Sequence, residues 1–326
     1  MSSEQSVAKP RRLEAKPFLL ADKIFFGLAN AAAYSAIVII LLVLVFLFGR
    51  AWPAFAEQGV LAFVTDAGWD SSAEPILMRI GPMLYGTLLI AALGVAYAVP
   101  LAISVAYFIE FLAPRSVAKL ATLLIDLLAA IPSVVVGLWG LLVFSPVAAS
   151  WAEMLNGSLG WIPIFAHEEG NFRNSPFIAS LVLGTMIVPI IASVTREIFS
   201  QMDHEVIKAS LALGGNAEST FRKVILPTSA SGIVGGVLLG LGRAMGETVA
   251  IFFVLNLVFD RFNWERILEP EGGNIASLIL SKFGEAELDE IEGLMAAGVV
   301  LFVVTLIVNA LASFIVARAQ PWRKAQ

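Results

Sequence analysis

Long apolar runs separated by short polar segments dominate the chain. Several windows hold about 18 or more mostly apolar residues, and at ~1.5 Å per residue a helix of that length crosses a hydrocarbon core of about 30 Å. The pattern predicts six transmembrane helices, over residues 24–48, 83–109, 117–144, 177–198, 229–259 and 291–317. The sequence therefore predicts an all-α, polytopic membrane protein.

Prolines lie inside three of these predicted helices, at Pro100, Pro132 and Pro189. A proline has no backbone N–H, and in lipid the carbonyl that it leaves free must be satisfied by a neighbouring helix or by water. The prolines therefore indicate a packed bundle of helices with a pathway through it.

The two ends of the chain are polar. Residues 1–22 carry charges and scattered prolines, which favour a disordered cytoplasmic tail, and the apolar run that follows is too long for the core of a signal peptide. We therefore expect an uncleaved first helix, one six-helix transmembrane domain over residues 23–320, and a short cytoplasmic tail over residues 321–326.

Composition agrees with a membrane protein and argues against catalysis. Of the residues 58% are apolar and 14% charged, and the mean hydropathy is +0.85, whereas about a quarter of the residues of a soluble protein are charged. Cysteine is absent, and so is the G-x-x-x-x-G-K-[ST] loop that holds the phosphates of ATP. His167 lies beside two glutamates, but a solvated loop is the commoner explanation than a metal site. We expect no catalytic residues, no metal or other cofactor bound by this chain, and no nucleic-acid partner.

The basic residues indicate the orientation in the membrane. Of the 21 Lys and Arg residues, fourteen flank the predicted helices on the side of the N-terminus and six on the other side, and the remaining one is Arg243. Because basic loops stay in the cytoplasm, both termini are predicted to be cytoplasmic. The loops on the other side are acidic at residues 269–274 and 284–293, which indicates solubilising charge or a docking face for a soluble partner.

The longest cytoplasmic connection has the pattern of two helices joined by a turn. Apolar positions recur at helical spacing among charged ones over residues 198–213, which predicts an amphipathic helix outside the membrane. Gly214 and Gly215 end this helix, and Asn216 is a suitable N-cap for a second helix that Pro227 interrupts. The sequence predicts a compact knob on the cytoplasmic face.

This connection resembles a signature of the permease subunits of bacterial ABC importers, which reads E-A-A, three residues, G, nine residues, I-x-L-P. The matching positions are Lys208, Ala209, Ser210, Gly214, Val224, Leu226 and Pro227. The resemblance implies a coupling segment, at about residues 199–228, that docks on an ATP-hydrolysing subunit. Lys208 departs from the pattern because the family usually has Glu there, and the alternative is an ordinary interfacial helix-turn-helix.

Two further stretches resemble the C-type permease of phosphate-specific ABC importers: LLAAIPSVVVGLWG at residues 127–140 and GGVLLGLGRAMGET at residues 235–248. The resemblance runs from about Gly81 to the C-terminus. It implies the six-helix fold of a type I importer permease in the bacterial inner membrane, forming half of the pathway for phosphate. The implied partners are a second, A-type permease, a dimer of ATP-binding cassette subunits that uses the ATP, and a periplasmic phosphate-binding protein.

Two other functions stay open at this point. Charges in the membrane would equally suit a secondary transporter or channel for an anion. An ABC permease for another oxyanion, such as molybdate or phosphonate, would carry the same coupling signature.

The fifth predicted helix carries two charges among glycines. At 100° per residue, Gly232, Gly236, Gly240, Arg243 and Glu247 share an arc of about 80°, and the small residues let another helix approach closely. The two charges are therefore expected to face the bundle and not the lipid. A charge near the centre of the membrane costs on the order of 2.5–3.5 kcal/mol, so it must be paired or hydrated.

The charges have two interpretations. Arg243 and Glu247, one turn apart, either neutralise each other or line the substrate pathway. In the pathway, the guanidinium of Arg243 matches a tetrahedral oxyanion, and Glu247 accepts a hydrogen bond from a protonated oxygen that phosphate has and sulfate lacks. We favour the pathway.

Two more polar residues lie in the third predicted helix. For Asp126 a packing or hydrogen-bonding role is expected more than contact with substrate. Ser133, directly after Pro132, can offer a hydroxyl to a passing anion, although satisfying the interrupted backbone is the commoner role.

Overall fold

A computed structural model describes residues 20–167, 170–263 and 266–319, so the predicted tails lie outside the described residues apart from residues 20–22. The chain forms two compact units, Met1–Leu47 and Phe48–Gln326, and helix α1 (Leu20–Gln58) contributes to both. Six helices among the described residues are long and apolar enough to cross a membrane. The predicted helical membrane fold is confirmed in class and in the number of spans.

The elements of the second unit follow one another along the chain with short connections. After α1 come α2 (Val60–Thr65), β1 (Ala67–Asp70), β2 (Leu77–Ile80), α3 (Gly81–Tyr107), η1 (Phe108–Leu112), α4 (Arg115–Ala129), α5 (Ser133–Trp139), η2 (Gly140–Phe144), α6 (Ser145–Leu159), η3 (Pro163–Phe165), α7 (Pro176–Ser200), α8 (His204–Ala212), α9 (Ala217–Thr220), η4 (Phe221–Ile225), α10 (Leu226–Gly246), α11 (Val249–Val254), α12 (Ile275–Lys282) and α13 (Leu288–Ala319).

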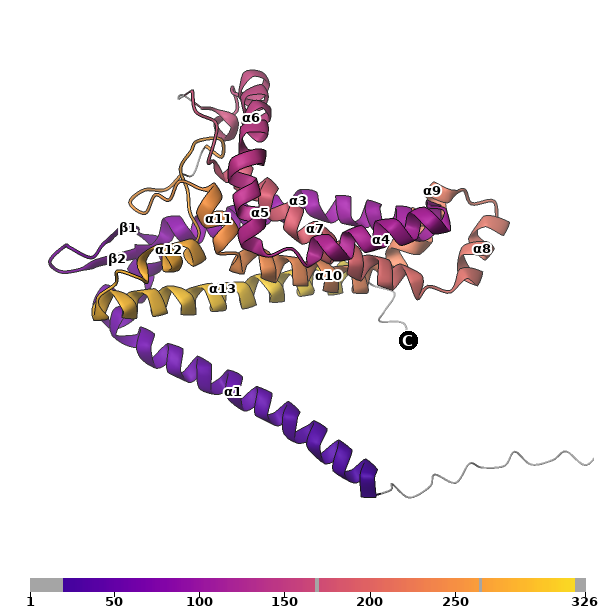
Figure 1. The fold of residues 1–326 in the computed structure, drawn as a ribbon, viewed down its shortest axis with the longest axis horizontal. Coiled ribbons are helices and arrows are strands. Elements are labelled where there is room, and N and C mark those ends of the chain that lie inside the picture. The colour runs from indigo at the N-terminus through magenta and orange to yellow at the C-terminus, as the bar shows by residue number, and fades with distance from the viewer. Residues whose placement is uncertain (1–19, 168–169, 264–265, 320–326) are drawn as a thin grey trace, which may run out of the picture. The chain divides into compact units, whose positions relative to one another are not determined.

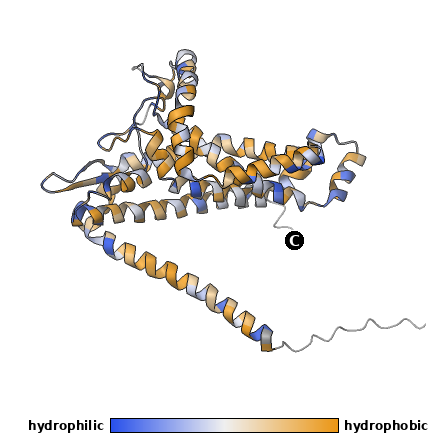
Figure 2. Ribbon diagram, in the orientation of Figure 1, coloured by the Kyte–Doolittle hydropathy of each residue, from blue (hydrophilic) through white to orange (hydrophobic). Residues whose placement is uncertain are grey.

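Helices α3, α7, α10 and α13 pack along one another, and α4 packs against α7. The hairpin of β1 and β2 lies with α12 at one end of this bundle, and α8 and α9 lie at the other end (Figure 1). Hydrophobic residues run along the helices, whereas hydrophilic residues gather in α8 and in the loops of the opposite end (Figure 2). This distribution fits a bundle whose middle lies in lipid and whose two ends lie in water.

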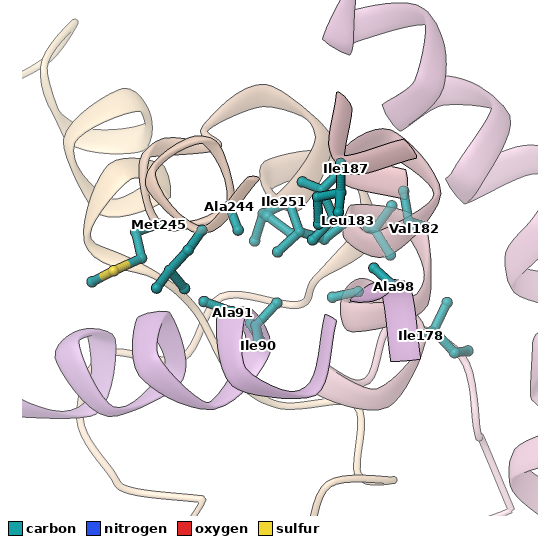
Figure 3. Close-up of a cluster of buried hydrophobic side chains, with 14 of the residues drawn as sticks. Ile90, Ala91, Ala98, Ile178, Val182, Leu183, Ile187, Ala244, Met245 and Ile251 are labelled. Atoms are coloured by element: carbon teal, nitrogen blue, oxygen red, sulfur yellow. The ribbon is translucent and has the colours of Figure 1, made fainter. Parts of the chain in front are cut away.

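The core of the bundle is centred on α7. Its side chains Ile178, Val182, Leu183 and Ile187 meet residues of α3, α10 and α11 in one buried cluster (Figure 3). Helix α7 begins behind Ser175, whose hydroxyl accepts a hydrogen bond from the backbone N of Ile178 at 3.5 Å. The fold therefore arranges the other helices around α7.

The predicted glycine face of α10 packs against α7. A Cβ atom added to Gly232, Gly236 or Gly240 would lie 2.6, 3.1 and 2.9 Å from side chains of α7, which are Ile198, Val194 and Ile191. The nearest carbon atoms of two packed side chains usually lie about 3.5–4.0 Å apart, so only glycine permits this approach of the two helices. This part of the prediction is confirmed.

The predicted bounds of the third span are wrong. Helix α4 ends at Ala129, the chain breaks at residues 130–132, and the stretch long and apolar enough to cross a membrane is Ser133–Leu159. The break follows from Pro132, which disfavours helical geometry for the residue before it and directly precedes the first residue of α5. α4, with its charged residues, is thereby a helix separate from the apolar stretch.

The predicted bounds of the fifth span are also wrong at both ends. The apolar span covers Ala217–Gly246 and begins at a capping box, in which Asn216 accepts from the backbone N of Ser219. Pro227 does not interrupt it, because Pro227 lies in the first turn of α10, directly after the π-helical turn η4. At the other end the helix stops at Gly246, before Glu247.

A two-stranded hairpin interrupts the otherwise helical fold, and the apolar pattern did not predict it. β1 pairs antiparallel with β2, with Ala67 opposite Ile80. The indole Nε1 of Trp69 donates a 2.6 Å hydrogen bond to Oε1 of Glu290, the buried residue near the start of α13. The hairpin is thereby fastened to the end of the bundle.

Candidate functional site

A cavity of about 350 Å³ lies among α4, α5, α7 and α10. Its lining consists of Leu128, Ile131, Val135, Val136, Trp139, Thr185, Met186 and Arg243. Thr185 lies nine residues after Pro176, or about 14 Å along α7, so the cavity lies between the two ends of the bundle. Because a water molecule takes about 30 Å³ of liquid, the cavity is large enough for a tetrahedral oxyanion together with several waters.

Arg243 is the one charged side chain among the described residues that line this cavity. It lies in the last turn of α10, closer to the end of its span than the sequence predicted. Within the part of the chain that the structure describes, its guanidinium forms no ion pair, and its Nε atom is buried without a hydrogen-bond partner. An unpaired guanidinium stays charged in apolar surroundings, so it requires an anion or water beside it.

Glu247 does not share a helix face with Arg243, and that prediction is wrong. Its backbone is extended, with φ −70° and ψ 123°, at the point where α10 ends. The side chain is buried, and its Oε1 accepts a hydrogen bond from the backbone N of Ala250 at 3.3 Å. Glu247 is not among the residues that line the cavity. The neutralising pair is therefore not formed, and a role for Glu247 in the pathway stays a prediction.

Asn274, which the sequence did not indicate as a functional residue, holds the backbone at Glu247, where α10 ends. Asn274, the N-cap of α12, donates from Nδ2 to the carbonyl oxygen of Glu247 at 2.7 Å, and its Oδ1 accepts from the backbone N of Ser277 at 2.7 Å. An Asn directly before an apolar run is an N-cap signal, which could have revealed the second bond. The first bond joins residues 27 positions apart, and no local pattern indicates it.

Asp126 and Ser133 lie outside the cavity lining. Asp126 is exposed on α4, and Ser133 is the half-buried first residue of α5. The structure therefore does not bring either residue together with Arg243, and their predicted roles stay predictions.

The segment with the importer signature forms the predicted knob. Helix α8 ends in a Schellman motif, in which the backbone N of Gly215 donates to the carbonyl of Ser210 at 3.0 Å and that of Gly214 to the carbonyl of Leu211 at 3.0 Å. Gly214 has φ +86°, a left-handed conformation that favours glycine. α9 then returns toward the bundle from its Asn216 cap. The predicted glycine turn and second helix are confirmed, but the predicted bounds of the first helix are wrong. Residues 198–200 end α7, and α8 begins at His204 behind the cap of Asp203, whose Oδ1 accepts from the backbone N of Glu205 at 2.8 Å.

A groove of about 710 Å³ runs over this knob, and five of its lining residues come from the signature or its turn: Ala209, Ser210, Gly214, Gly215 and Val224. Leu213 and Val206 also line this groove; the side chain of Leu213 is 90% exposed, and Val206 is exposed as well. Lys208 points away into an exposed ion pair, with its Nζ 2.8 Å from Oε1 of Glu205. The knob thus presents an exposed apolar surface.

Comparison with known proteins agrees with this geometry. Residues 98–323 match the family described as binding-protein-dependent transport system inner membrane component. The phosphate transport system permease protein PstC 2 of Mycobacterium tuberculosis is 34% identical over 92% of this chain and 93% of its own. Proteins named PstC from Mesorhizobium japonicum and Haemophilus influenzae are 31% and 34% identical, over 96% and 89% of this chain and 95% and 92% of their own.

Among solved structures, a bacterial alginate ABC transporter in complex with an alginate-bound periplasmic protein has a TM-score of 0.56, with 17% identity over 93% of this chain and 98% of the other. A second structure of an alginate importer has a TM-score of 0.51, with 15% identity over 91% and 99%. These two similarities concern the fold alone. With a family model that covers most of its length and relatives that align over 92% and 96% of it, this chain belongs to the binding-protein-dependent transport system inner membrane components, as a multi-pass subunit of the inner membrane.

Proposed function

We propose that this chain is the permease subunit of an ATP-driven phosphate importer and forms half of its translocation pathway. The unpaired Arg243 in a cavity between the helices carries this proposal, because a charge that must have an anion or water beside it is suited to a pathway for an anion. The relatives, 31–35% identical and named as phosphate transport permeases, support phosphate as the anion.

The chemistry of the cavity suits transient binding of an oxyanion. A guanidinium donates from several N–H groups in a fixed plane, which matches two oxygens of a tetrahedral anion. The rest of the lining is largely apolar, so few other contacts retain the anion. A pathway must hold its ion weakly enough to release it, and one cation in an apolar cavity meets that requirement.

We further propose that the knob of α8 and α9 binds the ATP-hydrolysing subunit, which uses the ATP. The exposed Leu213 and Val206 beside a groove support a protein partner at this surface. Gly214 fixes the turn that holds the two helices together. Lys208, where the family usually has Glu, is paired with Glu205 and does not line the groove, so the proposal assigns its charge no direct contact with the partner.

The complete importer in this proposal contains a second, A-type permease, a dimer of ATP-binding cassette subunits and a periplasmic phosphate-binding protein. Both termini and the knob lie in the cytoplasm, and the excess of Lys and Arg on that side of the predicted helices supports this orientation. The hairpin and α12 then face the periplasm.

Reconstitution of the complex in proteoliposomes tests the proposal. Phosphate uptake is expected only with ATP, with the ATPase subunits and with the binding protein, and excess sulfate or molybdate is expected not to inhibit it. Uptake by this chain alone without ATP would show a secondary transporter or channel. Inhibition by molybdate with no phosphate uptake would show an importer for another oxyanion.

A further inference from the structure

The cavity beside Arg243 contains one side-chain oxygen among its lining residues, the hydroxyl of Thr185 on α7. Helix α7 is otherwise the most enclosed of the six spans, with 61% of its apolar window buried. Over the fully described stretch 176–196, Thr185 is the one exposed residue, and both of its neighbours, Gly184 and Met186, are buried. The one exposed residue of this stretch of α7 thus lines the cavity.

The hydrogen of the Thr185 hydroxyl already forms a hydrogen bond within α7. Oγ1 of Thr185 donates a 2.7 Å hydrogen bond to the carbonyl oxygen of Val182, one turn earlier in the same helix. A hydroxyl has one hydrogen to donate and two lone pairs that can accept. With its hydrogen bound to Val182, the oxygen that faces the cavity is an acceptor.

The other polar groups of the lining are donors. Arg243 has only N–H groups, and the indole of Trp139 has one N–H and no acceptor. An anion whose oxygens all accept hydrogen bonds is satisfied by these two residues. An anion that also carries an O–H group needs an acceptor, and Thr185 supplies it.

We propose that Thr185 accepts the hydrogen bond of a protonated phosphate oxygen while Arg243 binds the unprotonated oxygens, so that the cavity distinguishes phosphate from sulfate. The proposal rests on the proposed function, since it assigns to the same cavity a residue that sets specificity. Phosphate keeps at least one proton at neutral pH and sulfate keeps none. The acceptor role that the sequence suggested for Glu247 is filled within the cavity by Thr185, because Glu247 is not among the lining residues.

Equilibrium binding of radiolabelled phosphate and sulfate to the reconstituted complex, without the binding protein, tests this role. Thr185→Val keeps the size of the side chain and removes the acceptor, and it is expected to weaken phosphate binding roughly tenfold and to leave sulfate binding unchanged. Thr185→Ser keeps the hydroxyl and is expected to bind phosphate within about twofold of the wild type. Thermal unfolding of each variant in detergent checks that it is folded.

Two results would overturn the proposal. An equal loss of phosphate and sulfate binding in Thr185→Val would show a donor or a packing role, and an unchanged phosphate affinity would show no role. Arg243→Gln separates this question from the proposed function, because it should weaken both anions. If Arg243→Gln leaves phosphate binding intact, the cavity is not the anion site, and the part of the proposed function that places the pathway at Arg243 fails with it.

Discussion

The contact between α3 and α7 beside the cavity allows a sharp test of the packing. Gly184 precedes Thr185, and a Cβ atom at this position would overlap the hydroxyl end of Tyr97 on α3. The one hydroxyl hydrogen of Tyr97 is shared between the carbonyl oxygens of Leu181 and Ser180, the latter at 3.3 Å. The substitution Gly184→Ala therefore has to displace the Tyr97 ring from α7.

The magnitude follows from three opposing effects. Alanine in a helix gains about 1 kcal/mol over glycine. Overpacking of a buried contact costs about 1–3 kcal/mol, and the loss of the Tyr97 hydrogen bond costs about 1 kcal/mol more. We expect Gly184→Ala to lower the free energy of unfolding by about 2 kcal/mol. In a Tyr97→Ala background the overlap is gone, so the same substitution should raise it by about 1 kcal/mol.

Reversible unfolding in SDS mixed micelles measures these differences, with the fluorescence of the chain's 7 tryptophans as the signal. Gly235→Ala on α10 is the matched control, because Gly235 is exposed and no atom lies within 4 Å of its added Cβ. It should raise the free energy of unfolding by about 1 kcal/mol, as expected for alanine in place of glycine within a helix. If Gly184→Ala has the same effect with and without the Tyr97 ring, the packing argument is refuted.

Two further predictions concern the turn residues. Asn274→Ala should lower the free energy of unfolding by about 2–4 kcal/mol, because it removes an N-cap and leaves the buried carbonyl of Glu247 unsatisfied. Asn274→Ser keeps the cap and should recover about 1 kcal/mol in the same SDS assay. Equal losses for the two variants would contradict this account. Gly214→Val places a β-branched residue at φ +86° and should reduce co-purification of the ATPase subunit several-fold by distorting the knob. Gly284→Val, in an open turn with no atom within 4 Å of its added Cβ, is the control, and equal recovery of the ATPase with both variants would argue against docking at the knob.

Local and periodic features of this protein could be predicted from the sequence. The glycine face of α10 follows from helical spacing alone, and the structure packs it on α7. The knob was equally predictable, because caps and left-handed glycines act within a few residues of their positions in the chain. The lengths of the apolar runs predicted the six spans, since length and hydropathy decide whether a helix can cross a bilayer.

Features that depend on distant contacts could not be predicted. Nothing near Glu247 in the sequence reveals the hydrogen bond from Asn274 that holds its carbonyl at the end of α10. Hydropathy carried the third predicted span across Pro132, but the backbone constraint of proline ends α4 there. The sequence did not indicate Thr185 as a site residue, because a single threonine in an apolar run is common in membrane helices and protein cores. Its importance follows only from the cavity that it shares with Arg243.

The most direct test of the account is ATP-driven phosphate uptake by proteoliposomes that contain the Arg243→Gln complex. We expect the initial rate to fall at least about 100-fold, since charge-assisted hydrogen bonds to an anion are worth on the order of 3 kcal/mol, while the ATPase subunits still co-purify in wild-type amounts. Arg243→Lys should recover only part of the rate, because an ammonium group lacks the planar pair of donors. Uptake by Arg243→Gln within about twofold of the wild-type rate would contradict the central claim that Arg243 binds the transported anion.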